Sequence, residues 1–223
     1  MALYKLTLIT FLVFAVSILY GQSKKPQHFG ISIGVGQNHY KMKKSNWMQT
    51  PINYNDSLNS ISSKSSIGFN LGFSYYLTLT KNILLRPTYT MALPSTGKLT
   101  FEGKSASETL DLRSVSFAFS VPINFKISTK GVNPYLTIGP GFSFLAQNDD
   151  VKHQVEFKAF NLLGQIGFGG EVPFKYFKIK PELLYLTGFS DMRKRKDNIY
   201  NNTISSLLQQ NLSLTFYICN LNN

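Results

Sequence analysis

The sequence contains one cysteine, Cys219, so no disulfide can form within the chain and no disulfide-linked partner is required. A lone thiol of this kind is expected to be an inert wall residue. Charged side chains are also scarce, at 15% of the sequence, compared with about 25% in typical soluble domains. Acidic residues are fewer than basic ones, with 11 Asp and Glu compared with 23 Lys and Arg. This composition argues against an ordinary soluble domain.

The patterns that mark common catalytic and cofactor sites are missing. The histidines His28, His39 and His153 do not have a metal-ligand spacing such as H-x-x-x-H. Neither a G-x-S-x-G elbow nor a phosphate-binding P-loop occurs. We therefore predict no catalytic residues, no cofactor and no metal site, and we expect that the protein is not an enzyme.

Long apolar runs are absent except near the N-terminus, where Leu6–Tyr20 forms one. Lys5 precedes this run, and the small residue Gly21 and the polar Gln22 follow it. The run is short for a membrane-spanning helix and has the flanks of a secretory signal. We predict a signal peptide over residues 1–21 and one domain over residues 22–223, with an uncleaved anchor as the alternative.

The stretch that organises the rest of the chain is Ile67–Leu79. Its apolar face would carry Ile67, Phe69, Leu71, Phe73, Tyr75, Leu77 and Leu79, and its other face Gly68, Asn70, Gly72, Ser74, Tyr76 and Thr78. A period of two indicates a strand, because successive side chains leave a pleated backbone on opposite sides. Strands of soluble domains usually have about 5–6 residues, whereas a tilted strand that crosses a bilayer needs roughly 9–11.

The unequal bulk of the two faces indicates which one points inward. The interior of an eight-stranded barrel is just wide enough for modest side chains. Rows of Phe, Leu and Tyr from every strand could not all fit there, so the Gly, Ser and Asn face must point in. A bulky apolar exterior is stable only against lipid. The competing interpretation is a secreted soluble barrel of the lipocalin kind, with its bulky residues inward around a ligand.

The same alternation recurs along the chain. The predicted strands are His28–Tyr40, Ile67–Leu79, Ile83–Leu93, Val115–Phe125, Pro134–Leu145, a sixth from Phe160, Phe177–Phe189, and a last one that includes Leu212–Ile218. The connections alternate between long and short, and Lys41–Ser65 and Pro94–Thr109 are the first two long ones. Short periplasmic turns and long external loops are typical of outer-membrane barrels. We predict an all-β, eight-stranded antiparallel up-and-down transmembrane barrel of the outer membrane, with both termini periplasmic.

Charged residues fall on inward positions near the short turns. They are Arg86, Lys126, Glu171, Lys178, Lys180 and Glu182. In a narrow lumen they are expected to meet as a salt-bridged, structural plug. A proton or ion path is the functional alternative.

A basic run, Arg193, Lys194, Arg195 and Lys196, lies in the last long connection. It could bind the phosphates of lipopolysaccharide, and a solvated loop is the simpler interpretation. Nucleic acid is not an expected partner, because the run is isolated and the predicted signal exports the chain.

Several motifs together resemble PorT-type proteins, small outer-membrane barrels of the type IX secretion and gliding machinery of some Gram-negative bacteria. The similar stretches are 25–34, Ser66–Phe73, Leu84-Leu85-Arg86-Pro87, Val121–Lys126, Asn133-Pro134-Tyr135-Leu136 and Phe177–Leu183. The family offers no catalytic or ligand residues. What the resemblance implies is an integral membrane component that works through other proteins of the secretion machinery.

Three functions follow as hypotheses. The first is a non-enzymatic accessory or assembly component of type IX secretion. The second is a structural or adhesive small porin-like barrel that acts through its external loops. The third and remotest is an outer-membrane lipid-modifying enzyme, for which His39, at the external end of the first strand, is the one candidate residue. In every case outer-membrane lipid and lipopolysaccharide are expected to surround the barrel.

Overall fold

The computed structural model describes residues 27–45, 58–93, 98–103, 107–111, 114–127, 133–147, 157–194 and 204–220. The predicted signal peptide lies outside the described residues. No helix that could span a membrane occurs in the part of the chain that the structure describes.

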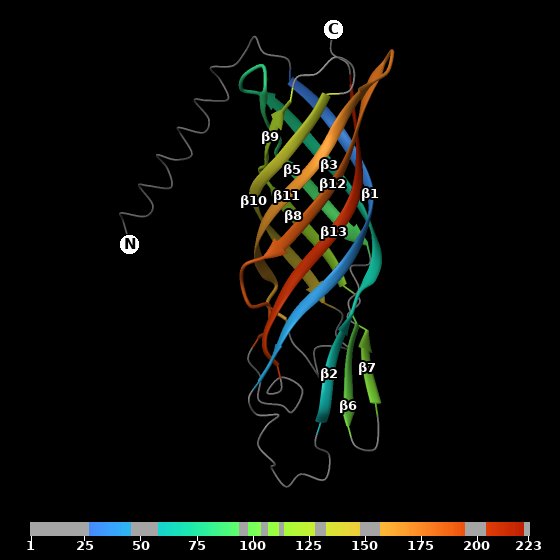
Figure 1. Ribbon diagram of the computed structural model, residues 1–223, viewed down its shortest axis with the longest axis vertical. Helices are drawn as coiled ribbons and strands as arrows, with labels where there is room; N and C mark the ends of the chain where they lie inside the picture. The colour runs from blue at the N-terminus through green and yellow to red at the C-terminus, as the bar shows by residue number, and fades with distance from the viewer. Residues whose placement is uncertain are drawn as a thin grey trace, which may run out of the picture.

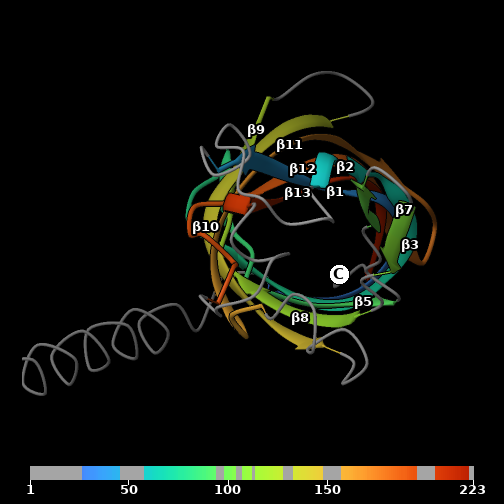
Figure 2. The same ribbon diagram turned by 90° about the horizontal axis from the view of Figure 1, so that it is seen from below.

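Tilted antiparallel strands form a closed ring (Figures 1 and 2). Six crossings are single strands: β1 (Gln27–Lys44), β3 (Ser66–Thr78), β10 (Asn133–Gln147), β11 (Phe160–Pro173), β12 (Phe177–Gly188) and β13 (Ile204–Asn220). Two crossings consist of two short strands each: β4 (Ile83–Leu85) with β5 (Thr88–Leu93), and β8 (Ser114–Ser120) with β9 (Ile123–Lys126). β1 closes the ring by pairing with both β13 and β3. The predicted antiparallel up-and-down arrangement is confirmed.

The prediction of unbroken strands over Ile83–Leu93 and Val115–Phe125 is wrong. Each is interrupted at a proline, Pro87 and Pro122, because proline has no N–H to donate to the ladder. The two breaks lie side by side, and the Arg86 N–H donates to the Pro122 carbonyl at 2.8 Å. The barrel wall therefore stays hydrogen-bonded across the interruption.

The bulky residues face outward. On β3, Ile67 is 76% and Phe73 66% exposed, whereas Asn70 and Ser74 on the other face are buried. Gly72 leaves room for the neighbouring strand, since a Cβ there would lie 2.4 Å from the Tyr89 carbonyl oxygen. The lipocalin-like alternative, with bulky residues inside, is wrong for these strands.

A second, three-stranded sheet extends beyond one end of the barrel (Figure 1). It consists of β2 (Leu58–Lys64), β6 (Lys98–Gly103) and β7 (Ser107–Asp111). The sequence prediction of connections over Lys41–Ser65 and Pro94–Thr109 is wrong here, because β1 runs on to Lys44 and three strands lie in these segments. Their Ser, Lys and Thr content hid short alternations such as Leu99 and Phe101, both buried. We call this sheet the outer extension.

The two ends of the barrel differ. Tight connections occur at one end, where the Leu79 N–H donates to the Ile83 carbonyl at 3.0 Å and the Phe174 N–H to the Phe177 carbonyl at 2.8 Å. The beginning of β1 and the end of β13 lie at the same end, since Gln27 pairs with Leu77 and Asn220 with Phe177. We call this the turn end, and the opposite one, which carries the outer extension, the extension end.

Candidate functional site

A buried ion pair crosses the lumen near the turn end. Arg86 precedes the break at Pro87 and Glu182 lies on β12, four positions away around the ring, so the pair joins opposite walls. The two guanidinium nitrogens of Arg86 donate to the two carboxylate oxygens of Glu182 at 2.5 and 2.9 Å. Both side chains are fully buried. Such a two-pronged pair is the strongest geometry available to Arg and a carboxylate.

Two tyrosines complete this layer. The Tyr135 hydroxyl on β10 donates to Glu182 at 3.0 Å, and the Arg86 guanidinium lies 4.2 Å from the centroid of the Tyr217 ring on β13. Gly169 makes room for Tyr135, since a Cβ there would lie 2.6 Å from the tyrosine hydroxyl oxygen. We call Arg86, Glu182, Tyr135 and Tyr217 the lumen plug.

A second charge cluster surrounds Glu171 on β11. Lys126 lies 2.9 Å and Lys178 3.0 Å from its carboxylate oxygens, and Lys180 lies 3.8 Å away. The Lys180 ammonium also lies 4.0 Å from the centroid of the Tyr76 ring. Lys126 and Lys178 are 24% and 26% exposed, whereas Glu171 and Lys180 are buried. We call these four residues the lysine cluster.

The structure thus brings the six predicted lumenal charges together in two groups. One is the neutral Arg86–Glu182 pair, and the other is the lysine cluster, which carries surplus positive charge. Sequence reasoning missed the aromatic members Tyr76, Tyr135 and Tyr217. The alternation within each strand already placed these three tyrosines on the inward face. The sequence alone does not indicate which charged side chain an inward tyrosine will contact.

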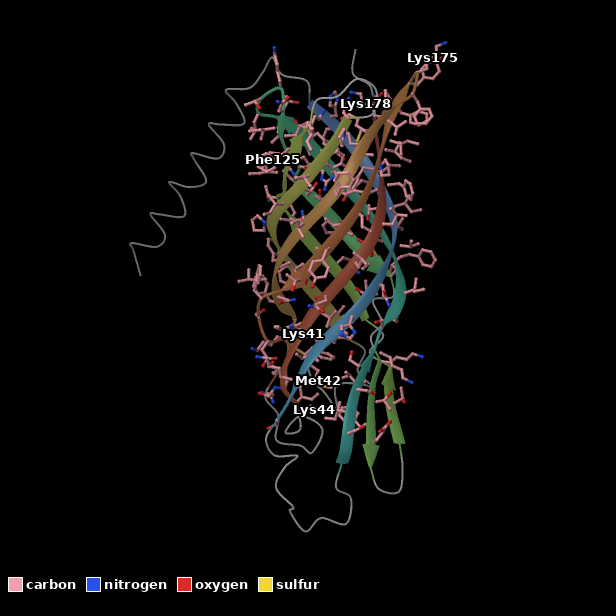
Figure 3. The ribbon with its side chains drawn as sticks, in the orientation of Figure 1. Lys41, Met42, Lys44, Phe125, Lys175 and Lys178 are labelled. Carbon is pink, nitrogen blue, oxygen red and sulfur yellow. The ribbon has the colours of Figure 1, made fainter. Side chains whose placement is uncertain are left out.

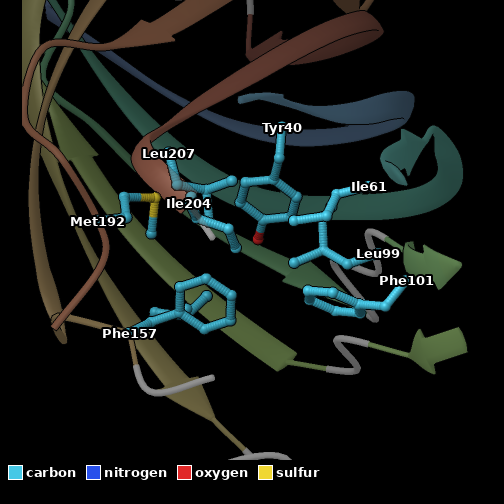
Figure 4. Packing of buried hydrophobic residues seen from close by; sticks show 9 residues of the cluster. Tyr40, Ile61, Leu99, Phe101, Phe157, Met192, Ile204 and Leu207 are labelled. Atoms are coloured by element: carbon cyan, nitrogen blue, oxygen red, sulfur yellow. The ribbon is translucent and has the colours of Figure 1, made fainter. Parts of the chain in front are cut away.

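At the extension end, apolar side chains from the barrel strands and from the outer extension pack together (Figure 4). The buried residues are Tyr40, Ile61, Leu99, Phe101, Leu145, Phe157, Met192, Ile204 and Leu207. Tyr40 on β1 stacks on Phe157 with ring centroids 6.0 Å apart. Leu145 lies on β10, on the opposite wall from β1. The cluster joins the outer extension to both walls, and we call it the apolar cap.

The apolar cap is expected to hold the outer extension in place. Replacing Ile61 by Val should weaken this attachment by about 0.5–1.5 kcal/mol, because one buried methylene is lost. Protease cleavage within the extension should then become roughly two- to tenfold faster, since the cleavage rate is proportional to the fraction of molecules in which the extension is transiently detached. Limited proteolysis in detergent would measure this. Ser62→Ala, at an exposed site on the same strand, is the control, and equal rates for the two variants would contradict the prediction.

Between the plug and the cap lies a small cavity of about 70 Å³. It is lined mostly by amide and hydroxyl side chains, among them Asn38, Asn70, Ser116, Ser143, Gln165 and Ser213. Asn38 accepts a hydrogen bond from Asn211 across the β1–β13 pair at 2.7 Å. The volume suits a few water molecules. In the part of the chain that the structure describes, the lumen is therefore filled by side chains at both ends of this cavity.

The basic run is only partly described. Arg193 is engaged within the protein: its guanidinium donates to the Ile204 carbonyl and lies 3.8 Å from the Asp191 carboxylate. Lys194 is exposed, and Arg195 and Lys196 lie outside the described residues. Contact with lipopolysaccharide stays a prediction.

His39 faces outward near the extension end. Its Nδ1 lies 3.4 Å from the Ser65 hydroxyl, in a groove of about 330 Å³ with Gln37, Tyr185 and Gln210 on its walls. No Asp or Glu is among the residues that line this groove. None of these described residues therefore supplies the carboxylate that orients the base in a Ser-His-Asp triad. In the described ranges, no three His, Cys, Asp or Glu side chains are grouped to hold a metal ion.

Comparison with known proteins gives a family and a set of structures of similar fold. The family described as "Outer membrane protein beta-barrel domain" matches residues 20–194. Among the matching structures, neisserial surface protein A has 9% identity and a TM-score of 0.49, with 87% of this chain and 99% of that chain covered. OprG from Pseudomonas aeruginosa has 11% identity and a TM-score of 0.46, with 89% and 96% covered.

The outer membrane enzyme PagL also matches, with 13% identity, a TM-score of 0.41, and 84% and 97% of the two chains covered. No curated protein matches the sequence. Identities this low carry no information on function. The family match, which covers most of the chain, is the finding on which the assignment rests.

Proposed function

This chain belongs to the family of outer membrane protein β-barrel domains, and from this premise we propose that it is a non-conducting, non-enzymatic barrel that works by binding partners through its outer extension. The observation that carries the proposal is the lumen plug. A buried, two-pronged Arg86–Glu182 pair joins opposite walls, and opening it would expose two uncompensated charges to a low dielectric. At the other end, the apolar cap joins opposite walls through packed apolar side chains.

In the proposed orientation, the turn end faces the periplasm and the outer extension faces the medium. Short turns at the periplasmic side are the rule for outer-membrane barrels, and both described chain ends lie at the turn end. The extension end carries exposed basic residues, including Lys41 and Lys44 (Figure 3) and Lys194. These suit the phosphate groups of lipopolysaccharide in the outer leaflet, together with the predicted contact at Arg193–Lys196.

For the partner, we propose the type IX secretion machinery, on the resemblance to PorT-type proteins. Four of the motifs that carry this resemblance contain the members Arg86, Lys126, Tyr135 and Glu182 of the plug and lysine cluster. The resemblance therefore supports a shared closed lumen more directly than a shared partner. A barrel closed in this way would serve as a scaffold and not as the conduit for cargo.

Deleting the gene should leave secreted cargo trapped in the periplasm, because the machinery would lack a component. Immunoblotting of periplasm and medium for a cargo protein would measure this, with the wild-type gene restored on a plasmid as the control. Normal secretion in the deletion strain would contradict the secretion role. A photo-crosslinking residue at the exposed Ser62 should capture the partner, and one at Lys81 in the turn should not.

A structural or adhesive barrel is the second candidate. The outer extension favours it, because it projects an ordered sheet beyond the barrel (Figure 1). In that case, deletion would spare secretion but reduce surface binding or envelope integrity. The lipid-modifying alternative predicts an altered lipid A or phospholipid profile on His39→Ala, and an unchanged profile would remove it.

A further inference from the structure

The lysine cluster has more positive charge than its own carboxylate can neutralise. Three ammonium groups surround Glu171, so two positive charges remain. The neighbouring Arg86–Glu182 pair is neutral as a unit and supplies no compensation. Surplus charge that is partly withdrawn from water is unfavourable unless an anion or solvent balances it.

The cluster is also accessible and contains an unused polar atom. Lys126 and Lys178 are each about a quarter exposed, and Figure 3 shows Lys178 at the turn end of the barrel. His28 on β1 pairs with Tyr76 on β3, the tyrosine whose ring lies 4.0 Å from the Lys180 ammonium. Its Nδ1 is buried without a hydrogen-bond partner. An anion that enters from the turn end would meet this nitrogen and several ammonium donors.

We propose that the lysine cluster, with His28, is a binding site for a phosphate group. Lysine ammoniums bind phosphate as point charges and need no fixed fork geometry, whereas arginine offers a fork to carboxylates and phosphates alike. Arg86, the nearby arginine, is already paired with Glu182. Inorganic phosphate or a phosphate monoester could neutralise both surplus charges, and the phosphodiester of a phospholipid headgroup could neutralise one of them. The group could belong to a phospholipid headgroup of the adjacent leaflet or to a soluble phosphate compound. This inference goes beyond the proposed function and does not depend on it.

Lysine reactivity in the wild-type chain tests the site without any substitution. In a phosphate-free maltoside detergent, inorganic phosphate should slow reductive methylation of Lys126 and Lys178, as read by mass spectrometry. Sodium chloride at equal ionic strength is the salt control. Lys175, on the tip of the neighbouring turn and exposed, is the internal control and should not change. Micelles containing phosphatidylglycerol in place of free phosphate test the lipid source.

Protection by free phosphate would identify a soluble ligand, and protection by phosphatidylglycerol alone a headgroup. Equal methylation rates with phosphate, phosphatidylglycerol and chloride would overturn the proposal. Thermal unfolding adds a second test, in which two variants should change the stabilisation by phosphate in opposite directions from the wild type. At ten times the dissociation constant, phosphate should raise the wild-type midpoint by roughly 3–5 °C.

The rise should be larger in Glu171→Gln, which removes the competing carboxylate, and absent in Lys126→Met/Lys178→Met. A rise of the same size in all three proteins would mean a general salt effect and would also overturn the proposal. If the double variant does not fold, the midpoint shifts of Glu171→Gln and the wild type still decide. If Glu171 had only a structural role, replacing it by Gln would not increase the midpoint shift caused by phosphate.

Discussion

Replacing Glu182 by Gln is expected to lower the free energy of unfolding by about 3–5 kcal/mol, because it leaves Arg86 charged and buried without a counter-ion. The side chain keeps its shape, so lost packing contributes little. Both partners are fully buried and the pair spans the lumen, which leaves water no easy route to the guanidinium. Urea titration in lipid vesicles, followed by gel mobility, would measure the change.

The matched control is Glu102→Gln on β6, an exposed carboxylate that accepts a hydrogen bond from Ser60 at 2.6 Å. Its effect should stay within about 0.5 kcal/mol. A triple variant, Arg86→Met, Glu182→Leu and Tyr135→Phe, tests whether the unpaired Arg86 charge causes the destabilisation. It should recover most of the unfolding free energy lost in Glu182→Gln, since no charge or hydroxyl of these three residues is then left unpaired. If Glu182→Gln unfolds like the wild type, the ion pair does not close the lumen.

The barrel itself was predictable because alternation repeats on every crossing. A bulky and a small face, as in β1 and β3, fix which side of the strand meets lipid, and a shift by one residue would reverse it. Inward charges near the turns were predictable for the same reason. Their register, counted from Ile83 or Phe177, placed Arg86, Lys178, Lys180 and Glu182 on the lumen side, and the closed ring then brought them together.

Other features depend on contacts between distant segments. Proline positions could be read from the sequence, but the side-by-side placement of the breaks at Pro87 and Pro122 follows only from the pairing of β4 with β9. The outer extension joins strands from two separate connections, and each alone is too short and polar to indicate a strand. The apolar cap likewise gathers Tyr40, Phe157 and Met192 from segments with no common pattern.

The outward face of β3 makes the lipid interaction testable by depth. Leu71 lies in the middle of the outward row, between Ile67 and Tyr75. It pairs with Ile33 and Met91 on the two neighbouring strands, β1 and β5. Leu71→Arg should lower the free energy of unfolding in lipid vesicles by about 2–4 kcal/mol, as for a charge at the bilayer midplane. Arginine at Ile67, near the extension end, should cost only about 0–1 kcal/mol.

The difference in destabilisation between Leu71→Arg and Ile67→Arg distinguishes contact with lipid from contact with water or with another protein. If water surrounded the barrel, as in a soluble protein, both arginines would be tolerated, since Leu71 is 46% and Ile67 76% exposed. If a second protein covered this face, the cost would follow contact with that protein and not depth. An equal cost at Leu71 and Ile67, or none at either, would contradict a membrane-embedded β3. The proposal of a scaffold in the outer membrane would then also fail, because it requires the outward apolar face of β3 to contact lipid.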